Sequence, residues 1–214
     1  MKIALLGNGK TGHFIKNSDF EVSVFNSTNI LTKVKIEDCD IVISFVPGSV
    51  FVEYIDELFE SKKPVIVAST GFQWPNNFDK KLKEENLTWV YSSNFSKGLF
   101  IYKALIELLE KKYKLLNSPT CHIHEVHHTK KLDSPSGTAL SINAWFGNNA
   151  KITSERTGDI VGFHELTIST DSEEIKISHN AKTRKVFADG AIKACELVLQ
   201  NKLKPGLNQF YEVL

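Results

Sequence analysis

Short apolar runs recur along residues 2–92, separated by stretches with helical spacing. Several runs are almost continuously apolar and rich in β-branched and aromatic residues, as in strands buried on both faces of a parallel sheet. Strands that alternate with helices predict an α/β layer with right-handed crossovers. The predicted strands are 2–6, 20–25, 39–46, 64–70 and 87–92, and the predicted helices between them are 49–62 and 78–87.

After Asn94 the pattern changes. Residues 98–116 give the longest amphipathic helix signal of the chain. Two later runs, 163–170 and 174–181, alternate between apolar and polar residues, which favours strands with one covered face in an antiparallel or mixed sheet. Further predicted elements are a histidine-rich strand at 121–128 and helices at 139–146 and 186–200.

These patterns predict an α/β chain with two domains, joined near residues 95–98 and 182–187. We expect an N-terminal Rossmann-like parallel-sheet domain formed by residues 1–96 with 187–214. Residues 97–186 should form a mixed α+β domain.

Composition narrows the classes of partner. The formal net charge of +1 provides no global field that would attract nucleic acid or an anionic membrane. No apolar run approaches the roughly 20 residues that a membrane span needs, and the N-terminal segment lacks the features of a signal peptide. Cys39, Cys121 and Cys195 are far apart and form no CxxC pair, which is typical of reduced thiols in a cytoplasmic protein.

A glycine-rich turn follows the first predicted strand. Gly7, Gly9 and Gly12 form G-x-G-x-x-G at the start of a predicted helix. In this context the glycines permit a tight turn, close approach of a pyrophosphate and close packing of helix on strand. The turn therefore predicts a dinucleotide site, with a merely tight structural turn as the alternative.

The second predicted strand ends at Asn26, where the fingerprint has an acidic residue that binds the adenosine ribose. An amide can still bond a hydroxyl and does not repel a 2′-phosphate. Ser27, Thr28 and Lys33 could also contact a phosphate. NADPH and NADH both remain possible cofactors on this evidence.

Four histidines lie in the stretch HIHEVHHTKKLDSPSGTA, residues 122–139. One hypothesis is a metal site. On a strand His122, His124 and His128 would share one face, opposite Glu125 and His127. Two histidines two residues apart, with a third ligand, can hold a zinc ion with an open position.

The same stretch also supports a proton-transfer site. His127 and His128 end the predicted strand, Lys131 follows, and Ser136-Gly137-Thr138 begins a helix. Backbone N–H groups at that helix start could bind a carboxylate, while a lysine and a histidine could hold a second carboxylate and supply a proton. An ordinary strand end followed by a serine-capped helix would give the same spacing.

The segment EVHHTKKLDSPSGTA, residues 125–139, resembles the signature E-x-H-H-x-x-K-x-D-x-P-S-G-T-A of the dihydrodipicolinate reductase (4-hydroxy-tetrahydrodipicolinate reductase) family. All specified positions match. Weaker matches occur in the family's order at the glycine turn and in ASTG (68–71), SNFSKG (93–98), DIVGFHE (159–165), ISHNA (177–181) and VFADGAIKA (186–194).

The resemblance implies an oxidoreductase of diaminopimelate and lysine biosynthesis. Family members use NADPH or NADH to reduce 4-hydroxy-tetrahydrodipicolinate, a small dicarboxylate, to tetrahydrodipicolinate with loss of water. Their second domain binds substrate and builds a homotetramer, and the resemblance implies no metal.

The resemblance also implies roles for individual residues. His127 and Lys131 match the catalytic positions, and His128, Gly137 and Thr138 match contacts to the substrate carboxylates. The cofactor positions correspond to Gly7, Asn8, Gly9, Lys10, Thr11, Gly12, Asn26, Ala68, Ser69, Thr70, Ser93, Asn94, Phe95 and Ser96.

The chain departs from the family pattern in its shorter glycine turn, in Asn26, in Ala68-Ser69 where relatives have Gly-Thr, and in its shorter length. No departure removes a catalytic group. Two other hypotheses stand beside the reductase: a metal-dependent hydrolase that uses the histidines, and a non-catalytic Rossmann protein that senses NAD(P)(H).

Overall fold

The computed structural model describes residues 1–214, which divide into two compact units. Unit 1 comprises Met1–Phe95 and Arg184–Leu214, and unit 2 comprises Ser96–Thr183. Unit 1 is thus built from both ends of the described chain, whereas unit 2 is one continuous segment.

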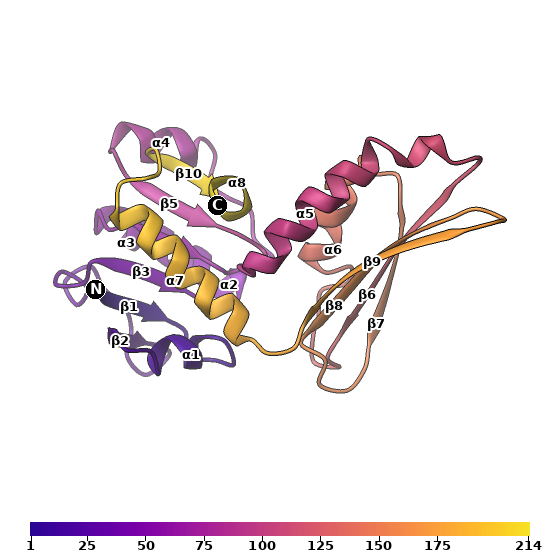
Figure 1. Cartoon of the computed structure of the whole chain (residues 1–214). Coiled ribbons are helices and arrows are strands. Elements are labelled where there is room, and N and C mark those ends of the chain that lie inside the picture. The colour runs from indigo at the N-terminus through magenta and orange to yellow at the C-terminus, as the bar shows by residue number, and fades with distance from the viewer. The chain divides into compact units, whose positions relative to one another are not determined.

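Unit 1 contains a six-stranded, entirely parallel sheet in the order β10-β5-β4-β3-β1-β2 (Figure 1). The five predicted strands are confirmed, with ends shifted by a few residues. A sixth strand, β10, was not predicted and extends the sheet beside β5. The strands are β1 (Lys2–Leu6), β2 (Glu21–Phe25), β3 (Ile41–Ser44), β4 (Val65–Val67), β5 (Thr88–Tyr91) and β10 (Gly206–Gln209).

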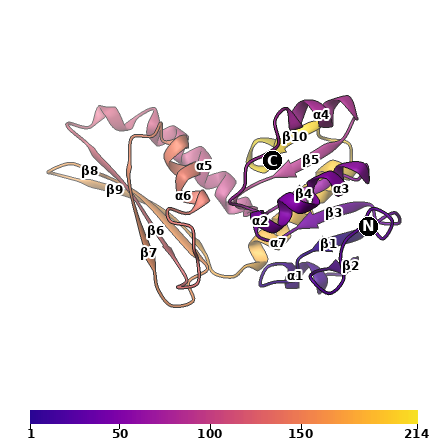
Figure 2. The same cartoon turned by 180° about the vertical axis from the view of Figure 1, so that it is seen from behind.

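Helices cover both faces of this sheet. On one face, α7 (Lys185–Leu199) packs through its small residues Ala188, Ala191 and Ala194, which let the helix approach the strands closely. On the other face, α2, α3 and α4 contribute aromatic and aliphatic residues to a second core. Figures 1 and 2 show α7 on one side and α3 with α4 on the other. The remaining bounds are α1 (Gly12–Lys16), α2 (Gly48–Phe51), α3 (Ile55–Glu60), α4 (Phe78–Glu84) and α8 (Phe210–Val213).

The helix predicted at 49–62 is interrupted. A 3-10 turn, Val52–Tyr54, separates α2 from α3. Phe51, Ile55 and Leu58 remain buried on both sides of the interruption. Their apolar spacing therefore continues through the tighter turn.

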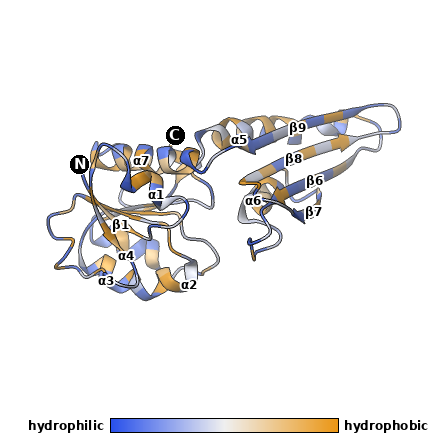
Figure 3. Ribbon diagram, turned by 90° about the horizontal axis from the view of Figure 1, so that it is seen from below, coloured by the Kyte–Doolittle hydropathy of each residue, from blue (hydrophilic) through white to orange (hydrophobic).

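Unit 2 holds a four-stranded mixed sheet in the order β7-β6-β8-β9. The β6–β7 pair is parallel, and β8 is antiparallel to both β6 and β9. Burial alternates along β8, and Figure 3 shows the matching change between hydrophilic and hydrophobic residues along the strands. The strands are β6 (Thr120–His127), β7 (Lys151–Arg156), β8 (Gly162–Ser169) and β9 (Glu174–Ala181). The prediction of an antiparallel or mixed sheet is confirmed.

Two helices, α5 (Lys97–Glu110) and α6 (Gly137–Trp145), cover the inner face of this sheet. The helix predicted to run to residue 116 ends at Glu110, and a 3-10 turn, Tyr113–Leu115, follows. Tyr113 packs on Phe146 with ring centroids 4.9 Å apart. No helix in either unit is both long enough and apolar enough to span a bilayer.

Candidate active site

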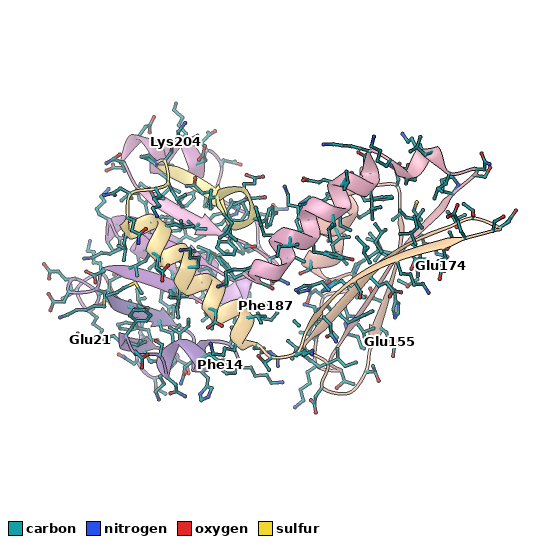
Figure 4. All side chains as sticks on the ribbon, in the orientation of Figure 1. Phe14, Glu21, Glu155, Glu174, Phe187 and Lys204 are labelled. Atoms are coloured by element: carbon teal, nitrogen blue, oxygen red, sulfur yellow. The ribbon has the colours of Figure 1, made fainter.

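The carboxyl ends of parallel strands meet at one edge of a sheet, where open α/β sheets bind ligands. At this edge unit 1 has a cavity of about 170 Å³. Figure 4 labels one of its lining residues, Phe187, near the start of α7. The lining residues are Thr11, Phe45, Ala68, Thr70, Ser92, Ser93, Asn94, Phe95 and Phe187.

The glycine turn between β1 and α1 is closely packed at its two ends and open in its middle. Gly7 has φ +95°, and a Cβ there would lie 2.8 Å from Cγ1 of Val46. A Cβ on Gly12 would lie 2.1 Å from the Gly7 carbonyl oxygen, whereas one on Gly9 would meet nothing within 4 Å. Gly7 and Gly12 are therefore required by the turn itself, and Gly9 leaves room for a ligand.

Backbone donors of this turn remain unused within the protein. The Gly7 N–H donates to the Phe25 carbonyl over 2.9 Å. The N–H groups of Asn8, Gly9 and Lys10 take part in no hydrogen bond of the backbone network. Free N–H groups in a glycine turn suit a pyrophosphate, so these residues fit the dinucleotide that the fingerprint predicts.

Asn26 stabilises the turn that follows β2. Its Oδ1 accepts hydrogen bonds from the Thr28 N–H, the Thr28 hydroxyl and the Asn29 N–H, at 2.9, 2.8 and 3.0 Å. The amide oxygen is thus occupied, and the NH₂ donor remains where the fingerprint has an acidic acceptor. Lys35 donates to Oδ1 of Asn29, while Lys33, the lysine proposed for a phosphate, bonds to Glu60 instead.

Three other predicted cofactor positions have roles within the protein. The Ser69 hydroxyl is buried and lies 2.9 Å from that of Ser44. Phe95 is buried against Phe210, with ring centroids 4.8 Å apart. Ser96 belongs to unit 2, where it precedes α5, and its hydroxyl lies 3.3 Å from Nε2 of His179.

In unit 2, β6 places Glu125 and His127 on the inner face of the sheet. Glu125 is fully buried, with an exposed fraction of 0%, and His127 is exposed by 7%. Oε1 of Glu125 accepts from Nη2 of Arg156 at 2.8 Å and from the Ser136 N–H at 3.3 Å. Oε2 is in direct contact with Nδ1 of His127.

The charges of this pair follow from its surroundings. Burial alone would raise the pKa of Glu125, but hydrogen bonds from Arg156 and Ser154, with nearby positive charge, bring it to about 2. Burial lowers the pKa of His127 to about 4, although the charge of Glu125 opposes this shift. Near neutral pH, the pair is therefore an ionised carboxylate beside a neutral imidazole, and the carboxylate favours the proton on Nδ1.

His164 connects this pair to the start of α6. Its ring meets that of His127 edge to face, with centroids 5.1 Å apart. Its Nε2 lies 3.2 Å from the Ser136 hydroxyl, which also accepts from the Ala139 N–H and so caps α6. Burial lowers the pKa of His164 to about 3, so it too is neutral.

The loop between β6 and α6 carries Lys131. Its Nζ donates to both oxygens of Asp133, at 2.8 and 2.9 Å. Arg156 donates to the Asp133 carbonyl at 2.6 Å, and the Ser134–Pro135 peptide is cis. Gly137 and Thr138 then form the first turn of α6, and His128 directly follows β6.

The histidines named in the metal hypothesis do not form the tightest group. His122 and His124 lie on the outer face, where both approach the Thr153 hydroxyl, at 2.8 and 3.1 Å. The residues whose ligand atoms lie within 4.8 Å of one another are Glu125, His127 and His164. Arg156 and His127 already engage the Glu125 carboxylate, so a cation would have to compete with a guanidinium, and the donor set fits proton transfer better.

Sequence reasoning assigned no role to Arg156 or His164, and it placed Ser136 at the predicted helix start without its contact to His164. His164 falls within the matched segment 159–165, which was a usable signal. Arg156 lies in β7, which was not predicted, so nothing placed it opposite β6. In unit 1, Phe45 could have been found because it directly follows β3 at the ligand-binding edge.

A dinucleotide-type parallel sheet and a second unit with a buried glutamate–histidine pair define a nucleotide-dependent oxidoreductase of two units. Two family models match: "Dihydrodipicolinate reductase, N-terminus" over residues 4–95 and "Dihydrodipicolinate reductase, C-terminus" over residues 102–214. The chain belongs to the dihydrodipicolinate reductase family and is an NAD(P)H-dependent enzyme, which confirms the predicted fold class and family.

Individual relatives agree. The 4-hydroxy-tetrahydrodipicolinate reductase of Christiangramia forsetii is 32% identical, over 100% of this chain and 98% of that protein. That of Thermosipho africanus is 47% identical over a segment that covers 53% of this chain and 51% of the relative. The dipicolinate-bound dihydrodipicolinate reductase of Paenisporosarcina sp. TG-14 has the same fold, with a TM-score of 0.75 at 14% identity, and covers 100% of this chain and 99% of that one.

Proposed function

We propose that this protein reduces 4-hydroxy-tetrahydrodipicolinate to tetrahydrodipicolinate with NADPH or NADH and loss of water, in diaminopimelate and lysine biosynthesis. The observation that carries the proposal is the segment 125–139, which matches the family signature and supplies His127, Lys131 and the first turn of α6. The name of the full-length relative from Christiangramia supports this substrate, and the dipicolinate bound by the structural neighbour is also a small ring dicarboxylate.

Within this proposal unit 1 binds the nucleotide. The free N–H groups of the glycine turn hold its phosphates, and the residues around the cavity, including Thr70 and Asn94, hold its nicotinamide end. When bound, the nicotinamide supplies a hydride. Loss of hydroxide as water consumes one proton per turnover, so residues of the chain must deliver a proton. They must also bind the two carboxylates of the substrate.

Unit 2 carries these tasks. Lys131 offers an ammonium, and the α6 N-terminus at Gly137 and Thr138 offers N–H groups and a hydroxyl. His128 is the third carboxylate contact. His127 is neutral before substrate binds, and the two negative charges of the substrate would raise its pKa and favour the protonated form. His127 and Lys131 are then the two groups that can donate the proton.

We also propose a cytoplasmic homotetramer assembled through unit 2, with no nucleic-acid or membrane partner. The family resemblance and the absence of a covering helix on the outer face of the β6–β9 sheet support this assembly. Light scattering on the purified protein tests it, and a monomeric mass at assay concentrations would contradict it.

The activity is tested by the loss of reduced-nicotinamide absorbance with freshly generated substrate and each cofactor. We expect turnover with at least one of them. Cofactor binding without turnover would instead indicate a sensor. Activity that depends on one tightly bound zinc ion per chain would indicate a metal-dependent enzyme.

A further inference from the structure

The ion pair between Glu125 and Arg156 is largely buried, and its burial costs free energy of folding. The glutamate side chain is 0% exposed and that of Arg156 is 18% exposed. Burying such a pair removes two charges from water, and well-packed apolar residues often stabilise a fold equally well. Stability alone therefore does not explain these two residues, and neither belongs to the proposed contacts with substrate.

The strand register brings the pair together. β6 and β7 run parallel, with Glu125 opposite Ser154 and His127 opposite Arg156. From this position Nη2 of Arg156 reaches Oε1 of Glu125 at 2.8 Å and the Asp133 carbonyl at 2.6 Å. One guanidinium thus joins the strand that carries His127 to the loop that carries Lys131.

We propose that Glu125 and Arg156 are positioning residues for the two proton-carrying groups, an inference that rests on the proposed function of the site. Glu125 receives the Nδ1–H of His127 and thereby directs Nε2 of the ring toward the substrate. Arg156 fixes the Glu125 carboxylate and, through the Asp133 backbone, the residue whose side chain holds Lys131.

The geometry around His127 supports this assignment of its nitrogens. Nδ1 faces Oε2 of Glu125, a group that can only accept a hydrogen bond when ionised. Nε2 lies beside Gly162, where an added Cβ would be 3.1 Å away. The absence of a side chain at position 162 leaves space next to the nitrogen that we assign to proton transfer.

The geometry at Lys131 supports the role proposed for Arg156. Asp133 accepts two hydrogen bonds from the ammonium, and its own carbonyl accepts from Arg156. A lysine side chain is flexible and loses considerable rotamer freedom when held. Because Asp133 holds the lysine and is itself held by Arg156, this rotamer freedom is already lost before substrate binds.

The first experiment uses Glu125→Gln, which keeps the shape of the side chain but can present an N–H to His127. We expect kcat to fall by about 10²-fold or more, as when a carboxylate that orients a catalytic histidine becomes an amide. The dissociation constant for the nucleotide should not change. Glu173→Gln is the matched control, because it makes the same chemical change at an exposed position in the turn between β8 and β9.

Nitrogen NMR of histidine-labelled protein near pH 7.5 gives a readout that a purely structural role would not move. The wild type should show His127 protonated on Nδ1, and Glu125→Gln should shift the proton toward Nε2, with the His127→Gln spectrum identifying the signal. An unchanged tautomer in Glu125→Gln, or wild-type kcat in that variant, would overturn the proposal.

Two further variants keep the proposal testable if Glu125→Gln does not fold. Glu125→Asp retains the charge at shorter reach and should keep the Nδ1–H tautomer with a partial loss of kcat. Arg156→Lys removes the planar guanidinium whose Nη2 donates to both Glu125 and the Asp133 carbonyl. The variant should lower kcat about tenfold, since an ammonium does not reproduce that geometry, and should raise KM for the dicarboxylate more than KM for the nucleotide. Equal changes in both KM values would count against a role for Arg156 at Lys131.

This design separates the inference from the proposed function. If the wild type does not turn over, the reductase proposal fails, while the tautomer of His127 in the wild type and Glu125→Gln still decides the role of Glu125. If the wild type is active and the tautomer does not respond, only the positioning role fails.

Discussion

The two units prepare their sites in opposite ways. In unit 1 the ligand-binding edge relies on backbone: a glycine turn with unused N–H groups and positions where an added atom would collide. In unit 2 the site relies on buried side chains whose charges are fixed by their neighbours. We therefore expect unit 1 to be sensitive to added atoms and unit 2 to lost polar groups and to protonation.

The largest effect should come from His127→Gln. General acid–base groups contribute about 10²–10⁴-fold to rate, so we expect kcat to fall in that range while nucleotide affinity is retained. Lys131→Ala should act similarly. Steady-state kinetics and a nucleotide titration measure both quantities, with Lys130→Ala, at an exposed position of the same loop, as control. A parallel loss of nucleotide affinity would place His127 in the cofactor site and remove the contrast between the units.

Acid should destabilise unit 2 before unit 1. Six of the seven histidines lie in unit 2, and His127 and His164 have pKa values lowered to about 4 and 3. Between pH 6.5 and 4 the unfolded chain therefore binds protons that the folded chain does not, and stability falls as pH falls. Both histidines contribute to this loss.

Glu125 adds a further loss in the same direction, between its ordinary pKa of 4.5 and about 2. Hydrogen exchange followed by mass spectrometry between pH 7 and 4 resolves the two units. Protection lost first in β1–β5 would contradict the expected order.

The variants Gly12→Ala and Gly9→Ala separate the packing role of the glycine turn from its role in binding nucleotide. The new Cβ at residue 12 meets the Gly7 carbonyl oxygen, so we expect a loss of about 1–3 kcal/mol in the free energy of unfolding. At residue 9 it meets no protein atom, so stability should hold while nucleotide affinity falls. Thermal unfolding and nucleotide titration test the pair, and full affinity in Gly9→Ala would move the phosphate away from this turn.

The smallest effect concerns the choice of nucleotide. Asn26→Asp keeps an oxygen for the three hydrogen bonds of the turn but replaces the NH₂ donor with negative charge. We expect KM for NADPH to rise about tenfold, equivalent to about 1.4 kcal/mol, with little change for NADH. Asn26→Glu should shift the preference in the same direction. An unchanged ratio of kcat/KM values in Asn26→Asp would show that another group reads the 2′-phosphate.

The sequence allowed most of the architecture to be predicted, because buried parallel strands are nearly continuous apolar runs. All five predicted strands of unit 1 and three of unit 2 were found. β10 and β7 were missed for a physical reason. Gly206–Gln209 and Lys151–Arg156 lie at sheet edges, are short or largely polar, and carry no periodic signal.

The candidate site could be predicted only where its residues lie close together in one segment of the sequence. His127, Lys131 and Gly137 lie within one segment, so their spacing could match a signature. The contact between Glu125 and Arg156 depends on the register of β6 against β7 and on burial, neither of which a single strand pattern contains. Likewise, only the turn geometry shows that the Asn26 oxygen is already occupied.

The strand β10 has a consequence for biosynthesis on the ribosome. The N–H of Leu207 donates to Oδ1 of Asp79 across 128 positions of sequence, and β10 pairs with β5. Unit 2 is one continuous segment, so its whole chain is synthesised before the last strand of unit 1 emerges. Because domains fold as units during synthesis, unit 2 can acquire its structure first, and the nucleotide-binding sheet is completed only once β10 has left the exit tunnel.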